Sequence, residues 1–91
     1  MTLKTREVSK SLMKKGFAQY NNDHKYFVFK YNGIDTEIRT KISHSHNEIG
    51  DDLIFQMSKQ LKMSKDFFKE FIECAKTEND YIKTLKNKSI I

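Results

Sequence analysis

The sequence has few of the residues that cross-link or interrupt a chain. Proline is absent, glycine occurs three times, and Cys74 is the only cysteine among 91 residues. A lone cysteine cannot form an intramolecular disulfide, which excludes the disulfide scaffold of a small secreted domain. The chain also has no internal repeat and no linker-like stretch. We therefore expect a single domain over residues 1–91.

Long hydrophobic runs are absent as well. No stretch approaches the roughly 20 apolar residues that span a bilayer, and no charged-then-apolar leader opens the chain. We therefore expect a cytoplasmic protein without a membrane segment. The hydrophobic share of 37% and the aromatic share of 12% indicate a folded chain with one modest core rather than a disordered one.

Acidic residues are scarce in the first half of the chain. Residues 1–42 contain nine Lys and Arg against four Asp and Glu, whereas residues 43–91 contain eight of each sign. The net charge of +5 therefore belongs to the first half. A basic patch on a small protein indicates a polyanionic partner such as RNA. A merely soluble, lysine-rich surface is the alternative that charge alone leaves open.

Local signals predict an α+β fold: a helix, a three-stranded antiparallel sheet, a second helix and an added C-terminal helical segment. The first helix is expected to start at Thr5, as its N-cap, and to end before Gly16. Its lysines, Lys15 included, are expected at the surface. Its apolar stripe is predicted to contain Leu3, Val8, Leu12 and Met13.

Three strands are expected over residues 17–20, 24–31 and 34–42, which are rich in aromatic and β-branched residues. Asn32-Gly33 supplies the positive φ angles of a two-residue type I′ turn between the last two strands. An unbroken ladder from that turn puts four pairs on the helix-covered face: Tyr31 with Ile34, Phe29 with Thr36, Phe27 with Ile38, and Lys25 with Thr40. The opposite face pairs Lys30 with Asp35, Val28 with Glu37, Tyr26 with Arg39, and His24 with Lys41.

The second half of the chain is predicted to be helical. A helix over residues 51–61 carries an apolar stripe of Leu53, Ile54, Met57 and Leu61. Ser64 is the expected cap of a third helix, whose apolar face contains Phe67, Phe68, Phe71, Ile72 and Ala75. A fourth helix is expected over residues 77–85. The C-terminal helical extension then covers residues 64–86, and residues 87–91 form a flexible tail.

Several short stretches resemble the HicA family of toxin ribonucleases. Arg6 to Phe17 is similar to that family's opening helix, which runs into a Gly-aromatic step. Residues 22–27 (Asn-Asp-His-Lys-Tyr-Phe) lie where the family has a Gly-Ser-His-His stretch followed by apolar strand residues. Here Asp23 replaces the usual serine and Lys25 replaces the second histidine.

Two further stretches carry the same resemblance. His44 lies where the family often has a histidine between prolines, which are Ser43 and Ser45 in this chain. Residues 59–61 (Lys-Gln-Leu) resemble the end of the family's last helix. The resemblance covers about residues 4–63, and it implies a double-stranded-RNA-binding-like fold for this HicA-like core. It also implies a HicB-like antitoxin protein as partner.

The resemblance implies metal-independent cleavage of RNA with His24 as the catalytic residue, and neither metal nor other cofactor is expected. Imidazole exchanges protons near neutral pH, which suits attack of a ribose 2′-hydroxyl on the adjacent phosphate. Arg39 and Lys41 would hold the phosphate, and Tyr26 could stack on an unpaired base. The further expected RNA contacts are Lys10, Lys14, Lys25 and His44.

Other interpretations of the same residues remain open at this stage. One is that His24 is a surface histidine on an ordinary polar sheet face. Another is a non-catalytic RNA-binding module of the same fold, in which His24 is only a contact. His44 and His46 form a His-x-His pair, but a metal site usually needs more ligands than this pair offers. Cys74 is expected to be a small core residue. The phenylalanine-rich helix is more typical of a core than of a docking surface, and an interaction domain built on it would ignore the charge asymmetry.

Overall fold

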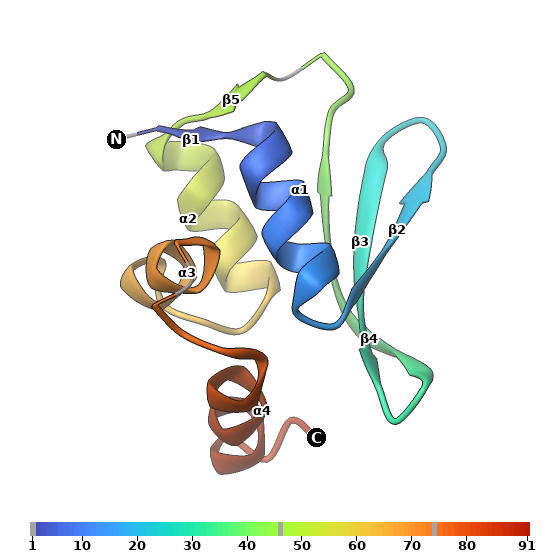
Figure 1. Ribbon diagram of the computed structural model, residues 1–91, viewed down its shortest axis with the longest axis vertical. Coiled ribbons are helices and arrows are strands. Elements are labelled where there is room, and N and C mark those ends of the chain that lie inside the picture. Colours follow the sequence, from blue (N-terminus) through green and yellow to red (C-terminus); the bar gives the residue numbers. More distant parts are fainter. Residues whose placement is uncertain (1, 46, 74) are drawn as a thin grey trace.

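The computed structural model describes residues 2–45, 47–73 and 75–91 (Figure 1). Its elements are β1 (Leu3–Lys4), α1 (Thr5–Lys14), β2 (Phe17–Asn21), β3 (Lys25–Tyr31), β4 (Ile34–Ile42), β5 (Glu48–Ile49), α2 (Asp51–Gln60), α3 (Lys65–Ile72) and α4 (Glu78–Asn87). The α+β class is confirmed, with an antiparallel β2-β3-β4 sheet after the first helix and helices at the C-terminus. The two-stranded β1–β5 ribbon is an addition that the sequence patterns do not predict.

Helix α1 is amphipathic, and its ends differ in detail from the prediction. Val8 and Leu12 are fully buried, whereas Met13 is 52% exposed and does not belong to the apolar stripe. Thr5 begins the helix but is not its cap. The cap position is Lys4, which makes no side-chain hydrogen bond, and the Thr5 N–H donates to the Asn47 carbonyl across 3.0 Å. The segment before β5 thus supplies the acceptor that a capping side chain would otherwise provide.

Lys15 is buried, contrary to the surface position expected for it. It is 8% exposed, and its Nζ donates to the Phe71 carbonyl and, across 2.8 Å, to the Lys76 carbonyl. These acceptors offset the cost of removing an ammonium group from water. The chain then turns at Gly16, where φ of +97° favours glycine, and a Cβ atom there would also lie 3.1 Å from the Phe29 ring.

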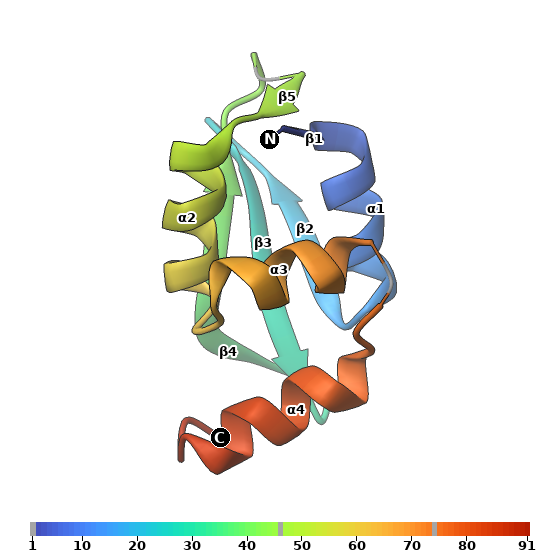
Figure 2. The ribbon, with the colours of Figure 1, turned by 90° about the vertical axis from the view of Figure 1, so that its left-hand side faces the viewer.

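Helices α1, α2 and α3 cover one face of the sheet and α4 lies across one end, so the opposite face carries no helix (Figures 1 and 2). The turn between β3 and β4 has the expected form, with φ of +54° at Asn32 and +77° at Gly33. This hairpin tip projects beyond the helices (Figure 1). Ile34, expected on the covered face, is therefore 69% exposed.

The predicted register of β3 and β4 is wrong by two residues beyond the Lys30–Asp35 pair. Val28 pairs with Arg39, Phe27 with Thr40, Tyr26 with Lys41, and Lys25 with Ile42. The irregularity lies at Thr36, whose hydroxyl donates to the Phe29 carbonyl across 2.7 Å and accepts from the Ile38 N–H across 3.2 Å. Between the Lys30–Asp35 and Val28–Arg39 pairs, β4 is two residues longer than β3. The two bonds of the Thr36 hydroxyl replace part of the backbone ladder in this segment. Because the shift is an even number of residues, the residues of β4 beyond it keep their predicted faces.

The helices of the second half begin close to the predicted positions. Ser64 caps α3 by accepting from the Phe67 N–H, and Thr77 forms a capping box with Asp80 at the start of α4. Rings from both halves of the chain meet in one core: the Tyr81 ring centroid lies 5.0 Å from that of Phe29 and 5.2 Å from that of Phe71. The phenylalanine-rich face of α3 is thus mainly core, although Ala75 beyond its end is exposed.

The remaining predictions concern the C-terminus and two individual residues. Asn87 is the last residue of α4 rather than part of the tail, and after it the Ile90 N–H donates to the Leu85 carbonyl across 2.9 Å. The expectations for His46 and Cys74 fall outside the described residues. Within the ranges described, no helix has the length and apolar character needed to cross a bilayer.

Candidate nucleic-acid interface

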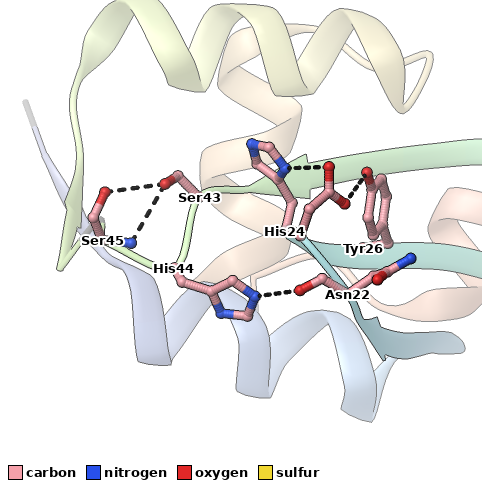
Figure 3. A network of polar contacts seen from close by, with 7 residues as sticks. Asn22, His24, Tyr26, Ser43, His44 and Ser45 are labelled. Carbon is pink, nitrogen blue, oxygen red and sulfur yellow. Dashed lines mark hydrogen bonds and ion pairs between the residues drawn. The ribbon is translucent and has the colours of Figure 1, made fainter.

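Two polar contacts and one ring contact link the turn after β2 to the start of β3. The Tyr26 hydroxyl donates to Asp23 Oδ1 across 2.8 Å, and the other carboxylate oxygen, Oδ2, lies 3.3 Å from His24 Nδ1 (Figure 3). The second contact is a bent ion-pair contact rather than a straight hydrogen bond, since Nδ1 has no well-aligned acceptor among the described residues. The rings of His24 and Tyr26 meet edge to face, with centroids 6.1 Å apart. One carboxylate therefore orients both rings.

His24 borders a hollow between the sheet and α2. Lys41 and Ser43 line it from the sheet side, and Leu53, Gln56 and Gln60 line it from α2. An adjoining hollow shares Lys41 and Gln60 and is completed by Tyr26, Arg39 and Thr40. The Thr40 hydroxyl donates to Gln60 Oε1 across 2.6 Å, which fixes the side-chain amide and leaves its Nε2 as a donor. The hollows form one continuous polar surface around the edge strand β4.

The electrostatics of this surface favour an anion. The hydrogen bond from Tyr26 holds the pKa of the Asp23 carboxyl below its usual range, and the contact with His24 acts in the same direction. The same bond raises the pKa of the Tyr26 hydroxyl, which therefore remains protonated at neutral pH. Neither Arg39 nor Lys41 has a carboxylate partner within the described part of the chain. Of these two uncompensated cations, Lys41 borders the same hollow as His24, and Arg39 lies farther along β4 in the adjoining hollow.

This arrangement allows His24 to exchange a proton at a defined atom. A carboxylate beside Nδ1 favours the tautomer that carries its proton on Nδ1, which leaves the Nε2 lone pair as the base. In Figure 3 the second ring nitrogen of His24 lies on the side of the ring away from that carboxylate. The side chain is 35% exposed, so a substrate in the hollow can reach it.

The other predicted RNA contacts lie on a second surface. Lys10, Lys14 and Lys25 border a hollow between α1 and the sheet, together with Arg6, Ser9, Met13 and Gln19. His44 borders a hollow near the start of α1, which also contains Lys25, and its Nε2 lies 3.0 Å from the Asn22 carbonyl. Figure 3 shows His24 on the α2 side of the strand end and His44 on the α1 side. We call these cations (Arg6, Lys10, Lys14 and Lys25) the α1 basic surface.

The predicted site residues therefore divide into two groups. His24, Tyr26, Arg39 and Lys41 come together, although Tyr26 and not His24 is the residue opposite Lys41. Lys10, Lys14, Lys25 and His44 lie elsewhere. Among the described residues no group of three or more metal-ligating side chains is found.

The sequence patterns missed Asp23, Gln60 and Tyr20 as members of the site. Asp23 could have been recognised because it directly precedes His24 and stands three residues before a tyrosine in a polar turn, where Asp side chains bond locally. Gln60 is brought to the site only by the packing of α2 on β4. Tyr20 lies on the open face of the sheet beside Tyr26, its partner across β2 and β3.

No protein-family model, no curated protein and no solved structure matches this chain. Any functional assignment therefore rests on the residues and geometry described above.

Proposed function

We propose that the protein is a metal-independent endoribonuclease of HicA type, with a double-stranded-RNA-binding-like core and His24 as its catalytic residue. The observation that carries the proposal is the Asp23–His24 contact at the edge of a hollow lined by Lys41. Cleavage at a ribose phosphate needs a base for the 2′-hydroxyl and a cation for the phosphate. A histidine oriented through Nδ1 supplies the base, and the unpaired cation beside it supplies the positive charge.

The reaction is an intramolecular transesterification. His24 Nε2 removes the proton from a ribose 2′-hydroxyl, and the 2′-oxygen attacks the adjacent phosphorus. The bond from phosphorus to the 5′-oxygen breaks, and that oxygen takes up a proton from water, which gives a 2′,3′-cyclic phosphate and a 5′-hydroxyl. The His24 imidazolium then gives its proton to the hydroxide that is left, which regenerates the neutral base. Lys41 and Arg39 stabilise the negative charge that accumulates on the phosphate oxygens in the transition state. Asp23 stabilises the imidazolium formed in the first step.

A toxin of this type requires a partner that silences it. We include in the proposal an antitoxin protein of HicB type that covers the surface around His24, Arg39 and Lys41. Its contact surface would carry carboxylates, because two unpaired cations beside the hollow favour an acidic partner.

The test is cleavage of a mixed single-stranded RNA in EDTA by the wild type, His24→Ala and His44→Ala. General acid–base catalysis contributes roughly 10²–10⁴-fold, so His24→Ala should lose about that factor in rate. His44→Ala is the matched control, since His44 lies on the α1 side and bonds to a backbone carbonyl. Wild-type products should carry cyclic phosphate ends. Equal cleavage by the wild type and His24→Ala would refute the assignment of His24.

The α1 basic surface supports a second candidate, a non-catalytic RNA-binding module. No carboxylate within the described residues pairs with Lys10, Lys14 or Lys25, so these cations are available to phosphates far from His24. This candidate predicts salt-sensitive RNA binding without cleavage, and a smaller salt dependence after Lys10→Gln and Lys14→Gln. Cleavage by the wild type would exclude it.

A further inference from the structure

The open face of the sheet carries two tyrosines at paired positions on adjacent strands. Tyr20 on β2 and Tyr26 on β3 are direct antiparallel partners, and Tyr26 is in turn opposite Lys41 on β4. No helix covers this face (Figures 1 and 2). Adjacent strands are about 4.8 Å apart, so the two side chains start from neighbouring positions on one surface.

Each ring is fixed by a hydrogen bond from its hydroxyl to an aspartate. Tyr26 bonds to Asp23, as described above, and Tyr20 donates to Asp35 Oδ2 across 3.0 Å. Asp35 in turn lies 3.5 Å from Lys30 Nζ, so its charge is compensated on the spot. The hydrogen bond restricts rotation of the tyrosine side chain before a ligand binds. Less side-chain conformational entropy is then lost on binding.

The burial of Val28 shows how the Tyr20 ring lies. Val28 faces the open side of the sheet and does not belong to the core cluster, yet it is only 4% exposed. By the strand register, a line from Tyr20 on β2 to Asp35 on β4 crosses β3 at Val28. The Tyr20 side chain therefore extends across β3 over Val28. Because Tyr20 is still 45% exposed, part of its ring remains open to solvent.

Tyrosine rings on an uncovered sheet face beside unpaired cations match the chemistry of unpaired nucleic acid. Bases of every kind stack on tyrosine faces, and cations beside the rings hold the backbone phosphates. Arg39 and Lys41 occupy the strand next to Tyr26, and the His24 ring meets Tyr26 edge to face. A strand that stacks on both tyrosines would therefore run directly to His24.

We propose that Tyr20 and Tyr26 form a two-ring platform on which consecutive bases of single-stranded RNA stack. This inference rests on the proposed function for the identity of the ligand, and it assigns the substrate class as unpaired RNA rather than duplex. A base-paired helix cannot present its base faces to the rings, because they are stacked inside the duplex.

The experiment measures binding of labelled 2′-O-methyl oligouridine of about ten nucleotides, a length in the range bound by single-strand-binding folds. This probe lacks the 2′-hydroxyl and cannot be cleaved, so binding is measured independently of catalysis. An abasic strand of equal length and a duplex of the same RNA test the role of the bases. Tyr20→Leu keeps Val28 covered but removes the aromatic face, and Tyr20→Phe keeps the ring but not the hydroxyl.

The wild type should bind the base-containing strand more tightly than the abasic strand and the duplex. Tyr20→Leu should weaken binding of the base-containing strand roughly 5- to 100-fold and leave the abasic strand unaffected, whereas Tyr20→Phe should retain most of the affinity. Phe55→Leu is the matched control, since Phe55 is 52% exposed on α2 and lies outside the platform.

Two results would overturn the platform. One is equal affinity for the base-containing and abasic strands, and the other is an unchanged affinity of Tyr20→Leu. If cleavage occurs without base-dependent binding, only this inference fails. If base-dependent binding occurs without cleavage, the platform stands and the catalytic proposal fails.

Discussion

The carboxylate of Asp23 serves two neighbours at once, accepting from the Tyr26 hydroxyl and facing His24 Nδ1. Its low pKa is a consequence of these contacts, because each stabilises the ionised form. A depressed pKa in the folded state means that this group adds to stability above its ordinary pKa, and that the contribution is lost as the pH falls through the lower, folded value. Asp23 therefore remains ionised beside His24 at neutral pH.

Replacing Tyr26 with Phe should raise the pKa of Asp23 toward the ordinary value of 3.8, since the hydroxyl is the largest cause of its depression. Carbon NMR titration of the Asp23 carboxyl measures this directly. Tyr20→Phe is the control, because the Tyr20 hydroxyl bonds to Asp35 and not to Asp23. An Asp23 titration curve that is the same in Tyr26→Phe and the wild type would contradict this account of the cluster.

At the scale of elements, Lys15 ties the end of α1 to the end of α3. Its ammonium group donates to the Phe71 carbonyl at the C-terminal end of α3 and to the Lys76 carbonyl in the loop that follows. The last carbonyls of a helix have no partner within it, so a cation there satisfies them and suits the helix dipole. The ring of Phe71 completes the contact, with its centroid 4.7 Å from Nζ.

Lys15→Met should therefore destabilise the fold by about 1–3 kcal/mol, because it removes the ammonium donor from the buried Phe71 carbonyl and from the Lys76 carbonyl. Urea unfolding monitored by circular dichroism gives the difference. The adjacent Lys14 is exposed, so Lys14→Met should change the free energy of unfolding by less than about 0.5 kcal/mol. Equal effects of the two substitutions would argue against the buried contact.

The elements that sequence patterns predicted correctly are those specified by neighbouring residues. Asn32 and Gly33 form their turn through their own positive φ angles. Ser64 caps α3 by accepting from the Phe67 N–H, only three residues further along the chain. Lys15 was misplaced because its acceptors come 56 and 61 residues later. The site was predicted in part for the same reason: His24 and Tyr26 share a strand end, whereas their relation to Lys41 depended on a register that Thr36 changes.

The whole molecule has one hydrophobic core to which both halves of the chain contribute. Phe17 and Phe29 come from the sheet region, and the rings that cover them, Phe71 and Tyr81, come from α3 and α4. The Tyr81 hydroxyl also donates to the Leu61 carbonyl across 2.7 Å, which joins α4 to the end of α2. Residues 4–63 therefore depend on residues outside this range for their packing.

A chain that ends at Met63 should fail to fold stably. It would expose Phe17 and Phe29 to water, and burying such a side chain contributes about 1.5–3 kcal/mol, a large part of the net stability of a small domain. Proton NMR of the truncated and full-length chains distinguishes the outcomes by dispersion of the amide signals. A dispersed spectrum from residues 1–63 would show that this part has a sufficient core of its own.

The irregularity at Thr36 constrains how the length of β4 can vary. Removing two residues around it would restore a plain ladder that keeps Val28 opposite Arg39 and Tyr26 opposite Lys41, with both cations still on the open face. Removing one residue would instead turn both cations toward the helices and Thr40 outward. Related chains that keep both cations on the open face should therefore differ here by even numbers of residues, so the parity of this segment matters more than its length.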